Sequence, residues 1–482
     1  MQNGEGLNPS PISSSFADDG LPLSQGVLAL PYPDHEGQYF LLHEDMDYPT
    51  ATGVGVHSKR FYYSSIDMNS NAGLGIVMDK NVIIVEDTLD IGKITATNHG
   101  NGRDWWVLVR EYGTNRYYKI FIDPEGVHNY GILSVGMPTP SPSLGQAVFS
   151  SDGSKYVNLN IYDFEQGNFI NIYDFDRCKG LLENDLQINY TDSVWSGGVA
   201  VSPNSRFLYV SSYEFIYQYD LWSSDIADSK VVVAEYDGYL EEITPSFYLP
   251  TRFHLMQLAP DGKIYITTSN GVKSLHVINS PNLAGKACNV EQHAIKLMTY
   301  NARSMPNFPN YRLGPLPIQP SMEYSESGDT VYFTGSADGG EVFEWDFGDG
   351  EVVQSGNTIS HVYAQPGTYV VTLTVEAYCI SASVSDTVVV SFTGNAEANK
   401  PPQIILQPNP TQGHLGVQLN LDGAAGNCSF LLYDATARPA LRQRLLTGWN
   451  SLDLSQVPTG LYFYEIKEEG RLLGSGKLVR VE

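Results

Sequence analysis

Short runs of β-branched and aromatic residues recur along the first 310 residues, and Gly, Asn, Asp or Pro separates one run from the next. Runs of this length between turn-forming residues predict β-strands, whereas the apolar spacing of a long helix is nearly absent. The expected strands include 39–43, 82–86, 105–110, 117–122 and 207–211. The pattern therefore predicts an all-β fold.

One unit repeats within this region, in the segments VFSSDGSKYVNL, VAVSPNSRFLYVSS and MQLAPDGKIYITTS. Each predicts a strand, a tight turn and a second strand, and an aromatic-rich third strand follows. The turn residues Asp152, Asn204 and Asp261 lie 52 and 57 residues apart, close to the ~40 to 50 residues of a four-stranded propeller blade. We expect residues 1–313 to form a β-propeller of about five to six blades.

The pattern changes after a Pro-rich stretch, GPLPIQP, at residues 314–320. In 369–376 apolar side chains at odd positions alternate with Val370, Thr372, Thr374 and Glu376, as in a half-buried antiparallel strand. A second joint, TGNAEANKPP at 393–402, precedes the last strand-rich segment. The expected order is a propeller (1–313), a linker (314–320), a β-sandwich (321–392), a linker (393–402) and a final β-domain (403–482).

Charge divides the chain in the same way. A chain of 482 residues with 42% hydrophobic residues and a net charge of −26 is too long for one core and too aromatic for a disordered chain. The net charge is −15 up to residue 320, −11 from 321 to 400 and zero from 401 onwards. Such an acidic surface disfavours binding to nucleic acid or anionic lipid, and no apolar run reaches the ~18 residues of a transmembrane helix.

The four cysteines, Cys178, Cys288, Cys379 and Cys428, are far apart and form no CxxC pair, so neither a zinc site nor a redox motif is expected. Buried free thiols are the main expectation. A disulfide between Cys178 and Cys288 remains open, because both lie in the expected propeller and sequence alone does not give their separation.

The segments at 87–109 and 270–290, together with MPNFPNY at 305–311, resemble the WD40-like propeller of large secreted Bacteroidetes proteins. In these relatives a signal peptide and an opening blade strand precede the propeller. Neither is visible in the first 20 residues, which lack a basic and then apolar leader. We therefore expect that the natural start lies upstream of residue 1.

The segments WDFGDG and HVYAQPGTY resemble the PKD domain, an immunoglobulin-like β-sandwich. The resemblance implies that Trp345 fills the core between the sheets and that Gly348 and Gly350 permit a tight turn. The residues that carry it are Trp345, Asp346, Phe347, Gly348, Asp349, Gly350, Pro366, Gly367 and Tyr369.

The segments LQPNPTQG, LSQVPTGLYFYEI and GKLVR resemble the type A C-terminal sorting domain of the type IX secretion system. The residues that carry this resemblance are Pro408, Asn409, Pro410, Gly413, Gly460, Tyr462, Gly476 and Lys477. It implies a β-sandwich that the outer-membrane translocon recognises. A sortase would then cleave within 393–403 and attach the protein to surface lipopolysaccharide.

No catalytic signature is present, since GxSxG, HExxH and Walker A sequences are all missing. Two groups of acids are candidates for a catalytic pair: Glu44 with Asp45 and Asp47, and Glu241 with Glu242. The neighbouring sequence gives no reason for the pKa of one acid in a group to be raised above that of another, so we expect solvated acids. We therefore expect no catalytic residues and no enzyme.

Other candidate chemistry is weak. Glu344, Asp346 and Asp349, with Glu351 nearby, are Ca²⁺ candidates, although a solvated acidic face is the simpler interpretation; no other metal or cofactor is expected. We expect four histidines in or beside strands to be hydrogen-bonded within the blades: His43, His99, His254 and His276. We expect five aromatic residues to pack between blades, with stacking on sugar rings as the alternative: Trp105, Trp106, Tyr112, Tyr117 and Tyr118.

These features together predict a non-enzymatic, secreted or surface-attached binding or adhesion protein. Its expected partners are the type IX translocon, its sortase and a protein or glycan ligand of the propeller, with the PKD domain as spacer or adhesion module. Two alternatives stay open: a propeller hydrolase acting on polysaccharide or peptide, which needs convergent carboxylates or a Ser and His in the channel, and a structural part of a surface or gliding assembly.

Overall fold

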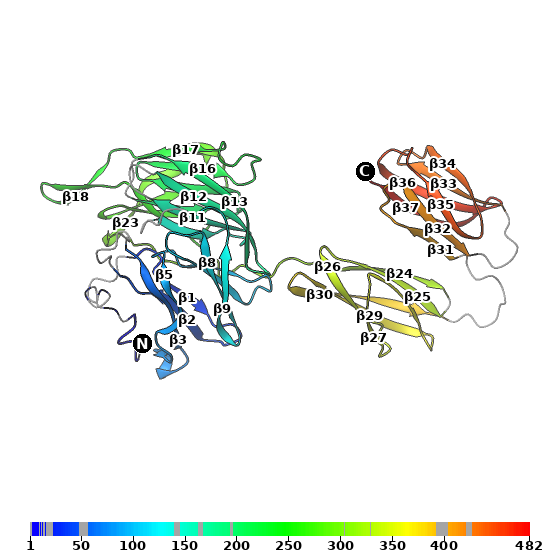
Figure 1. Ribbon diagram of the computed structural model, residues 1–482, viewed down its shortest axis with the longest axis horizontal. Coiled ribbons are helices and arrows are strands. Elements are labelled where there is room, and N and C mark those ends of the chain that lie inside the picture. Colours follow the sequence, from blue (N-terminus) through cyan, green and yellow to red (C-terminus); the bar gives the residue numbers. More distant parts are fainter. Residues whose placement is uncertain are drawn as a thin grey trace. The chain divides into compact units, whose positions relative to one another are not determined.

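The computed structural model describes residues 2–8, 10, 12, 15, 23–47, 56–138, 145–161, 167–192, 196–302, 304–327, 329–391, 403–420 and 427–482 (Figure 1). These residues form 37 strands and two short 3₁₀ segments, Asn71–Gly73 and Gly285–Cys288. The predicted all-β class is confirmed. No helix in the described part of the chain is long and apolar enough to cross a membrane.

Contacts between residues divide the chain into two compact units. The first contains Met1–Gln319 together with two short segments, Ala337–Glu341 and Glu376–Ala382. The second contains the rest of the chain from Pro320 onwards.

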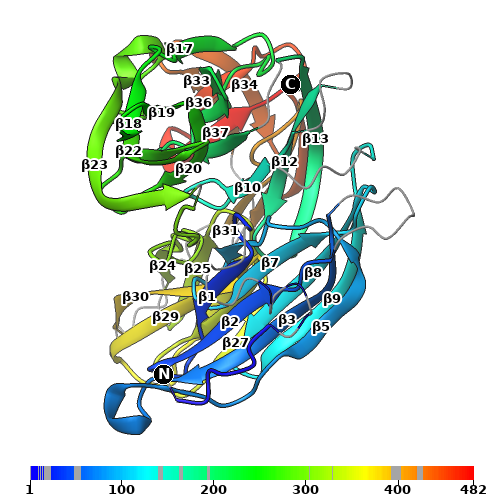
Figure 2. The ribbon, with the colours of Figure 1, turned by 90° about the vertical axis from the view of Figure 1, so that its left-hand side faces the viewer.

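The described residues of the first unit form five antiparallel sheets, and Figure 2 shows them following one another around a common centre. Four of them are meanders of consecutive strands, and in the first sheet the third strand pairs with both the fourth and the fifth. A two-stranded hairpin, β18–β19, separates the fourth and fifth sheets. We call these five sheets blades 1 to 5 in chain order. Blade 1 consists of β1 (Val27–Pro31), β2 (Gln38–Glu44), β3 (Ser58–Asp67), β4 (Ile76–Val77) and β5 (Val82–Leu89), and blade 2 of β6 (Thr95–Asn98), β7 (Trp105–Arg110), β8 (Arg116–Asp123) and β9 (Gly126–Ser134). Blade 3 consists of β10 (Gly145–Phe149), β11 (Lys155–Ile161), β12 (Asn168–Asp176) and β13 (Leu181–Tyr190), and blade 4 of β14 (Gly197–Val201), β15 (Phe207–Ser212), β16 (Phe215–Asp220) and β17 (Val231–Glu235). After the hairpin strands β18 (Leu240–Thr244) and β19 (Phe247–Pro250), blade 5 consists of β20 (Phe253–Leu258), β21 (Ile264–Thr268), β22 (Gly271–Ile278) and β23 (Val290–Ala302).

Neighbouring blades pack face to face through apolar side chains. One buried cluster joins blades 1 and 2, and further clusters join blade 2 to 3, 3 to 4 and 4 to 5. Every residue of β7, β14 and β15 is buried. A strand covered on both faces needs apolar residues at successive positions, which is why β7 has the sequence WWVLVR instead of an alternating one.

The strands and turns of the predicted blade unit are present. Asp152, Asn204 and Asp261 lie in the turns that join β10 to β11, β14 to β15 and β20 to β21. In the first turn the Asp152 carboxylate accepts hydrogen bonds from the Ser150 hydroxyl (2.6 Å) and the Ser154 backbone N–H (3.0 Å). Such side-chain to backbone bonds explain why these residue types recur at each turn.

Residues 321–390 form two packed sheets, as an immunoglobulin-like domain requires. Trp345 is fully buried and Gly348 has φ +76°, which agrees with the core and turn positions that the PKD resemblance implies. The sheets consist of β24 (Ser321–Ser327), β25 (Thr330–Ser336) and β28 (Thr358–Val362), and of β27 (Val352–Ser355), β26 (Gly340–Asp346), β29 (Gly367–Ala377) and β30 (Ile380–Val390).

Residues 403–480 form a second sandwich. Its two sheets pack against each other through fully buried apolar side chains, such as Val417 of one sheet and Phe430 and Ile466 of the other. The expected linker, 393–402, and the expected cleavage segment, 393–403, lie outside the described residues except for Gln403. The sheets consist of β31 (Gln403–Gln407), β32 (His414–Asn420) and β35 (Gly448–Asp453), and of β34 (Pro439–Leu445), β33 (Cys428–Asp434), β36 (Gly460–Glu468) and β37 (Arg471–Arg480).

The cysteine expectation is wrong for two of the four thiols. Cys178 forms a disulfide with Cys379, which lies in the segment Glu376–Ala382 of the first unit, while Cys288 and Cys428 are free and buried. Cys178 therefore does not pair with Cys288. Sequence could not indicate the partner, because the two bonded residues are 201 positions apart.

Candidate functional site

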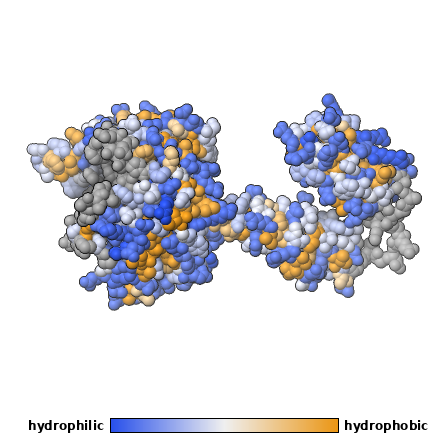
Figure 3. Space-filling model, in the orientation of Figure 1, coloured by the Kyte–Doolittle hydropathy of each residue, from blue (hydrophilic) through white to orange (hydrophobic). Residues whose placement is uncertain are grey.

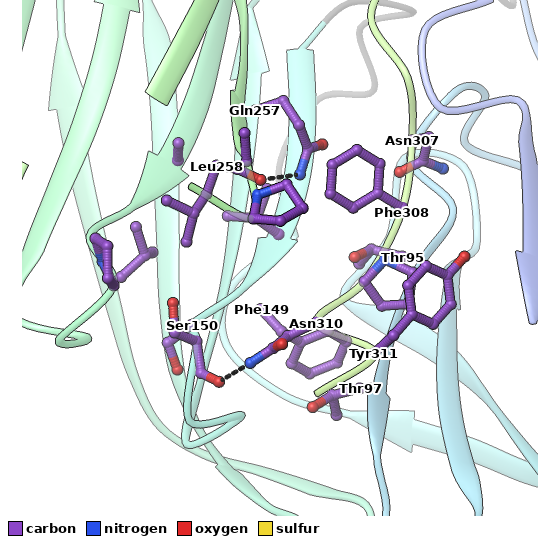
Figure 4. A pocket seen from close by; sticks show the side chains of 18 of the residues that line it. Thr95, Thr97, Phe149, Ser150, Gln257, Leu258, Asn307, Phe308, Asn310 and Tyr311 are labelled. Carbon is purple, nitrogen blue, oxygen red and sulfur yellow. Dashed lines mark hydrogen bonds between the residues drawn. The ribbon is translucent and has the colours of Figure 1, made fainter. Parts of the chain in front are cut away.

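A cavity of about 370 Å³ lies at the end of the propeller centre where the innermost strands run into the repeated turns (Figure 4). Phe149 of β10, Val201 of β14 and Leu258 of β20 line it from the blades. The segment after β23 completes the wall with Phe308 and Tyr311. A volume in the ~300 to 1,000 Å³ range is typical of small-ligand sites.

Side-chain amides hold the innermost strands close together around this centre. The Gln146 Oε1 atom on β10 accepts hydrogen bonds from the backbone N–H groups of Val199 (3.0 Å) and Met256 (3.1 Å). A Cβ atom at Gly198 would lie 2.5 Å from that same Oε1 atom, so the close approach of the strands requires glycine. The cavity wall is therefore a rigid part of the blades.

The segment 304–313 is anchored by its own polar side chains. The Asn307 amide nitrogen donates to the backbone oxygens of Val27 (3.0 Å) and Ile94 (2.9 Å). The Tyr311 hydroxyl donates to the oxygen of Ala29 (2.6 Å). These bonds connect the chain after blade 5 to blades 1 and 2, and they explain the MPNFPNY sequence as a fixed wall of the cavity.

The lining is mainly apolar, and its one charged side chain among the described residues is Arg312. Neither a carboxylate nor a histidine belongs to the described residues that line the cavity. Ser150 and Ser151 do line it, but the Ser150 hydroxyl donates to Asp152 and the Ser151 hydroxyl to the oxygen of Ser202 (3.3 Å). The lining offers binding groups, and it lacks the acid–base partners of a hydrolase among the residues described.

The structure buries acids that the sequence predicts to be solvated. Glu44 is 0% exposed and Asp45 4% exposed, so the expectation of a solvated group is wrong for both. Asp45 accepts hydrogen bonds from the Ser58 hydroxyl (3.0 Å) and from the backbone N–H of Lys59 (2.7 Å). The packing of neighbouring blades, which the local sequence does not contain, produces this burial.

Glu44 belongs to a buried polar cluster between blades 1, 2 and 3. Its carboxyl accepts a hydrogen bond from the Gly92 backbone N–H, and burial raises the pKa of Glu44 well above its usual range. Lys93 donates to the Asn160 side-chain oxygen (2.6 Å), and burial lowers the pKa of Lys93 to about 8. These groups are almost sealed from solvent, so a substrate has no direct access to them.

The expectation of a solvated acid is also wrong for Glu241. Its side chain is buried and pairs with the Lys296 ammonium (2.7 Å) and with the Ser274 hydroxyl (2.5 Å). Glu242 is exposed, as expected. Hydrogen bonds and the lysine lower the pKa of Glu241, although burial acts in the opposite direction, so this acid stays charged and ties β18 to β22 and β23.

Three of the four histidines bond to nearby groups, and three of the five aromatics are buried between blades. His43 contacts the Ser64 hydroxyl (3.1 Å), His99 the oxygen of Cys178 (3.1 Å) and His276 the oxygen of Thr251 (2.8 Å). Burial lowers the pKa of both His43 and His276 to about 4. The inter-blade interpretation of the aromatic set is confirmed for its buried members, which are Trp105, Trp106 and Tyr117.

The acidic turn of the PKD domain does not gather its carboxylates around one point. Asp349 accepts a hydrogen bond from the His361 ring (2.7 Å), and Asp346 accepts one from the Gly348 backbone N–H (2.9 Å). The His361 bond lowers the pKa of Asp349 against the effect of burial. No group of three acid, histidine or cysteine side chains that could hold a metal occurs in the described ranges, Glu344 included.

The sorting-motif residues meet although they are distant in sequence. The Asn409 side chain donates to the Lys477 oxygen (2.8 Å) and accepts from the Val479 backbone N–H (3.0 Å). The Tyr462 hydroxyl donates to the oxygen of Pro458 (2.8 Å). The loop around Asn409 is thus fixed against β37, the last strand, and presents Asn409 and Lys477 at the surface.

Sequence reasoning missed a junction in the first unit around Arg177 and Cys178. The buried Arg177 guanidinium donates to the backbone oxygens of Asn98 (2.9 Å), His99 (3.1 Å) and Gly314 (2.7 Å). The last of these bonds fixes the first residue of the Pro-rich segment, which sequence presents as a plain linker.

Gly100 lies against the disulfide at the same junction. A Cβ atom there would lie 2.4 Å from the Cys379 sulfur and 2.6 Å from the Cys178 sulfur, so only glycine fits. The Leu316 backbone N–H donates to the Gly100 oxygen (2.8 Å), which holds the Pro-rich segment in place. The one available signal is the glycine-rich turn NHGNGRD, whose shape does not reveal a cysteine partner.

Two family comparisons cover the C-terminal part of the chain. Residues 315–390 match the PKD domain family. Residues 406–480 match the secretion system C-terminal sorting domain. The second match indicates secretion and attachment at the cell surface, in agreement with the predicted type IX signal.

Comparison with curated proteins gives no match. Among solved structures, a putative 6-phosphogluconolactonase from Bacteroides uniformis shares 12% identity, with 57% of this chain and 86% of that chain covered and a TM-score of 0.33. PorZ, a surface component of the type IX secretion system of Porphyromonas gingivalis, shares 10% identity, with 95% and 81% covered and a TM-score of 0.20. The five sheets of the propeller are defined by their own strand pairing.

Proposed function

We propose that this chain is a non-enzymatic binding protein of the bacterial cell surface. The type IX secretion system would export it, the propeller would bind a ligand, and the PKD domain would act as spacer or adhesion module. The translocon and its sortase would be its partners during export.

The observation that carries the proposal is the lining of the propeller cavity. It combines a ligand-sized volume and a rigid apolar wall with Arg312 as the one charged group among the lining residues described. Binding sites of this type are mostly apolar and have few polar groups, whereas hydrolysis of a glycosidic bond needs two carboxylates ~5 to 9 Å apart. The lining supports binding over the hydrolase alternative.

Export is tested by deleting residues 403–482 in a host that has the type IX machinery, and by fusing the same residues to a periplasmic reporter. We expect the deleted protein to be lost from the surface and the reporter to appear there, as measured by protease accessibility on intact cells. Surface display of the deleted protein would contradict the proposal.

Binding without catalysis is tested separately on the purified full chain. We expect that a panel of polysaccharide and peptide substrates stays intact by mass spectrometry. Turnover that is abolished by substitutions in the propeller would favour the hydrolase alternative.

A further inference from the structure

The cavity also indicates the chemistry of its ligand; this inference rests on the proposed binding role of the propeller. Val201 and Leu258 from the blades belong to its apolar lining. The rings of Phe149, Phe308 and Tyr311 complete the lining (Figure 4). Covering such a surface with an apolar group gains ~25 cal/mol per Å² removed from water. The ligand should therefore have an apolar body.

Most polar side chains of the lining are already engaged within the protein. The amide nitrogen of Asn310 donates to the oxygen of Ser151 (2.8 Å), and that of Gln257 donates to the oxygen of Leu258 (3.0 Å). The Asn307 amide nitrogen and the Tyr311 hydroxyl donate to backbone oxygens as well. A sugar would bury many hydroxyls without partners here, at a cost of ~1 to 3 kcal/mol for each, so the lining disfavours a glycan.

Arg312 is the one cation of the described lining. Arg312 belongs to the residues that line the cavity and is exposed, and no ion pair or hydrogen bond of its guanidinium group occurs among the described residues. The chain up to residue 320 has a net charge of −15, so a cation without an acidic partner beside apolar lining differs from the mostly acidic character of this part of the chain. A guanidinium group binds a carboxylate through two parallel hydrogen bonds.

We propose that the cavity binds an apolar group that carries one carboxylate, with Arg312 pairing with the carboxylate and the apolar lining holding the body. Two sources supply this chemistry: a free aromatic or aliphatic acid, and the C-terminus of a peptide that ends in an apolar residue. The volume of about 370 Å³ accommodates one such group and not an extended chain.

The experiment is isothermal titration calorimetry on the full chain with two matched pairs of probes. The first pair is 3-phenylpropionate and its neutral amide; the second is acetyl-Gly-Gly-Phe with a free and with an amidated C-terminus. Three variants accompany the wild type: Arg312→Gln removes the cation, Ala259→Phe fills the cavity, and Arg471→Gln is a control at an exposed arginine of the sorting domain. Circular dichroism melting confirms that each variant is folded.

We expect each acid to bind about ten- to a hundred-fold more tightly than its amide. Arg312→Gln should lower the affinity of the acid by the same factor and leave that of the amide unchanged. Ala259→Phe should abolish both, and Arg471→Gln should change neither. Tighter binding of the tripeptide acid identifies a peptide C-terminus as the source, and tighter binding of 3-phenylpropionate identifies a free acid.

Equal affinity of acid and amide, or full affinity in Arg312→Gln, would overturn the proposal. If Ala259→Phe still abolished binding, the cavity would remain a ligand site and only the carboxylate assignment would fail. Absence of binding by all four probes at millimolar concentration would also overturn the ligand class, while the export and turnover assays would judge the proposed function independently.

Discussion

Removing the Cys178–Cys379 disulfide should destabilise the first unit strongly. The bond closes a loop of 201 residues, and in the chain-entropy description cross-linking such a loop removes about 18 cal/mol/K from the unfolded chain. That entropy corresponds to a free energy of unfolding of about 5 kcal/mol at 25 °C, as an upper value. We expect the Cys178→Ser/Cys379→Ser double variant to lose most of it.

The assay is urea denaturation of the full chain, followed by tryptophan fluorescence, with and without a thiol reductant. Reductant should lower the unfolding midpoint of the wild type to that of the double variant and leave the variant unchanged. Thiol titration of the denatured, unreduced protein should count the two free cysteines, Cys288 and Cys428. Four reactive thiols, or a peptide map that links Cys178 to Cys288, would refute the reasoning.

Three further predictions concern buried or bridging side chains. The pKa of His276 is about 4 in the folded state, against an ordinary value of 6.5. The free energy of unfolding should therefore fall by roughly 3 kcal/mol as the pH drops from 6.5 to 4. In a plot of the urea midpoint against pH, His276→Gln should flatten this part of the curve. The pKa of Glu44 is raised in the folded state, so burying this group destabilises the fold once the pH exceeds the ordinary pKa of a glutamate. Glu44→Gln should therefore raise the melting temperature more at pH 8 than at pH 4. An equal change at both pH values would contradict the burial argument. Asn409→Ala removes two hydrogen bonds to β37 and should cost about 1 kcal/mol and reduce surface display, whereas Asn420→Ala should leave display unchanged.

Sequence predicted the features that depend on local chemistry. The strand, turn and strand of blades 3 to 5 follow from apolar runs and from turn residues such as Asp152, whose side chain bonds to its own turn. The buried Trp345 follows in the same way from a short motif. In these places neighbouring residues decide the structure.

The features that sequence did not predict depend on contacts between distant segments. Glu44 and Glu241 look like ordinary surface acids, and only the adjacent blade or hairpin buries them. Cys379 finds Cys178 across 201 positions, and Gly100 is needed only because the disulfide lies against it. The cavity likewise forms where the strands of several blades meet the segment 304–313, so no single stretch of sequence contains it.

Figure 3 shows one further surface feature, an apolar area on an otherwise mostly hydrophilic face of the first unit. Ile83 of β5 and Tyr130 and Ile132 of β9 are exposed side chains of the same unit. The two strands are neighbours, since the Asn129 amide donates to the oxygen of Ile84 (3.4 Å).

The central claim is that the propeller cavity binds a ligand and leaves it chemically unchanged. The most direct measurement is to saturate the full chain with acetyl-Gly-Gly-Phe, separate the complex by gel filtration and identify the released ligand by mass spectrometry. The account predicts recovery of the intact peptide from the wild type and none from Ala259→Phe. Recovery of cleaved peptide, or equal retention by Ala259→Phe, would contradict it.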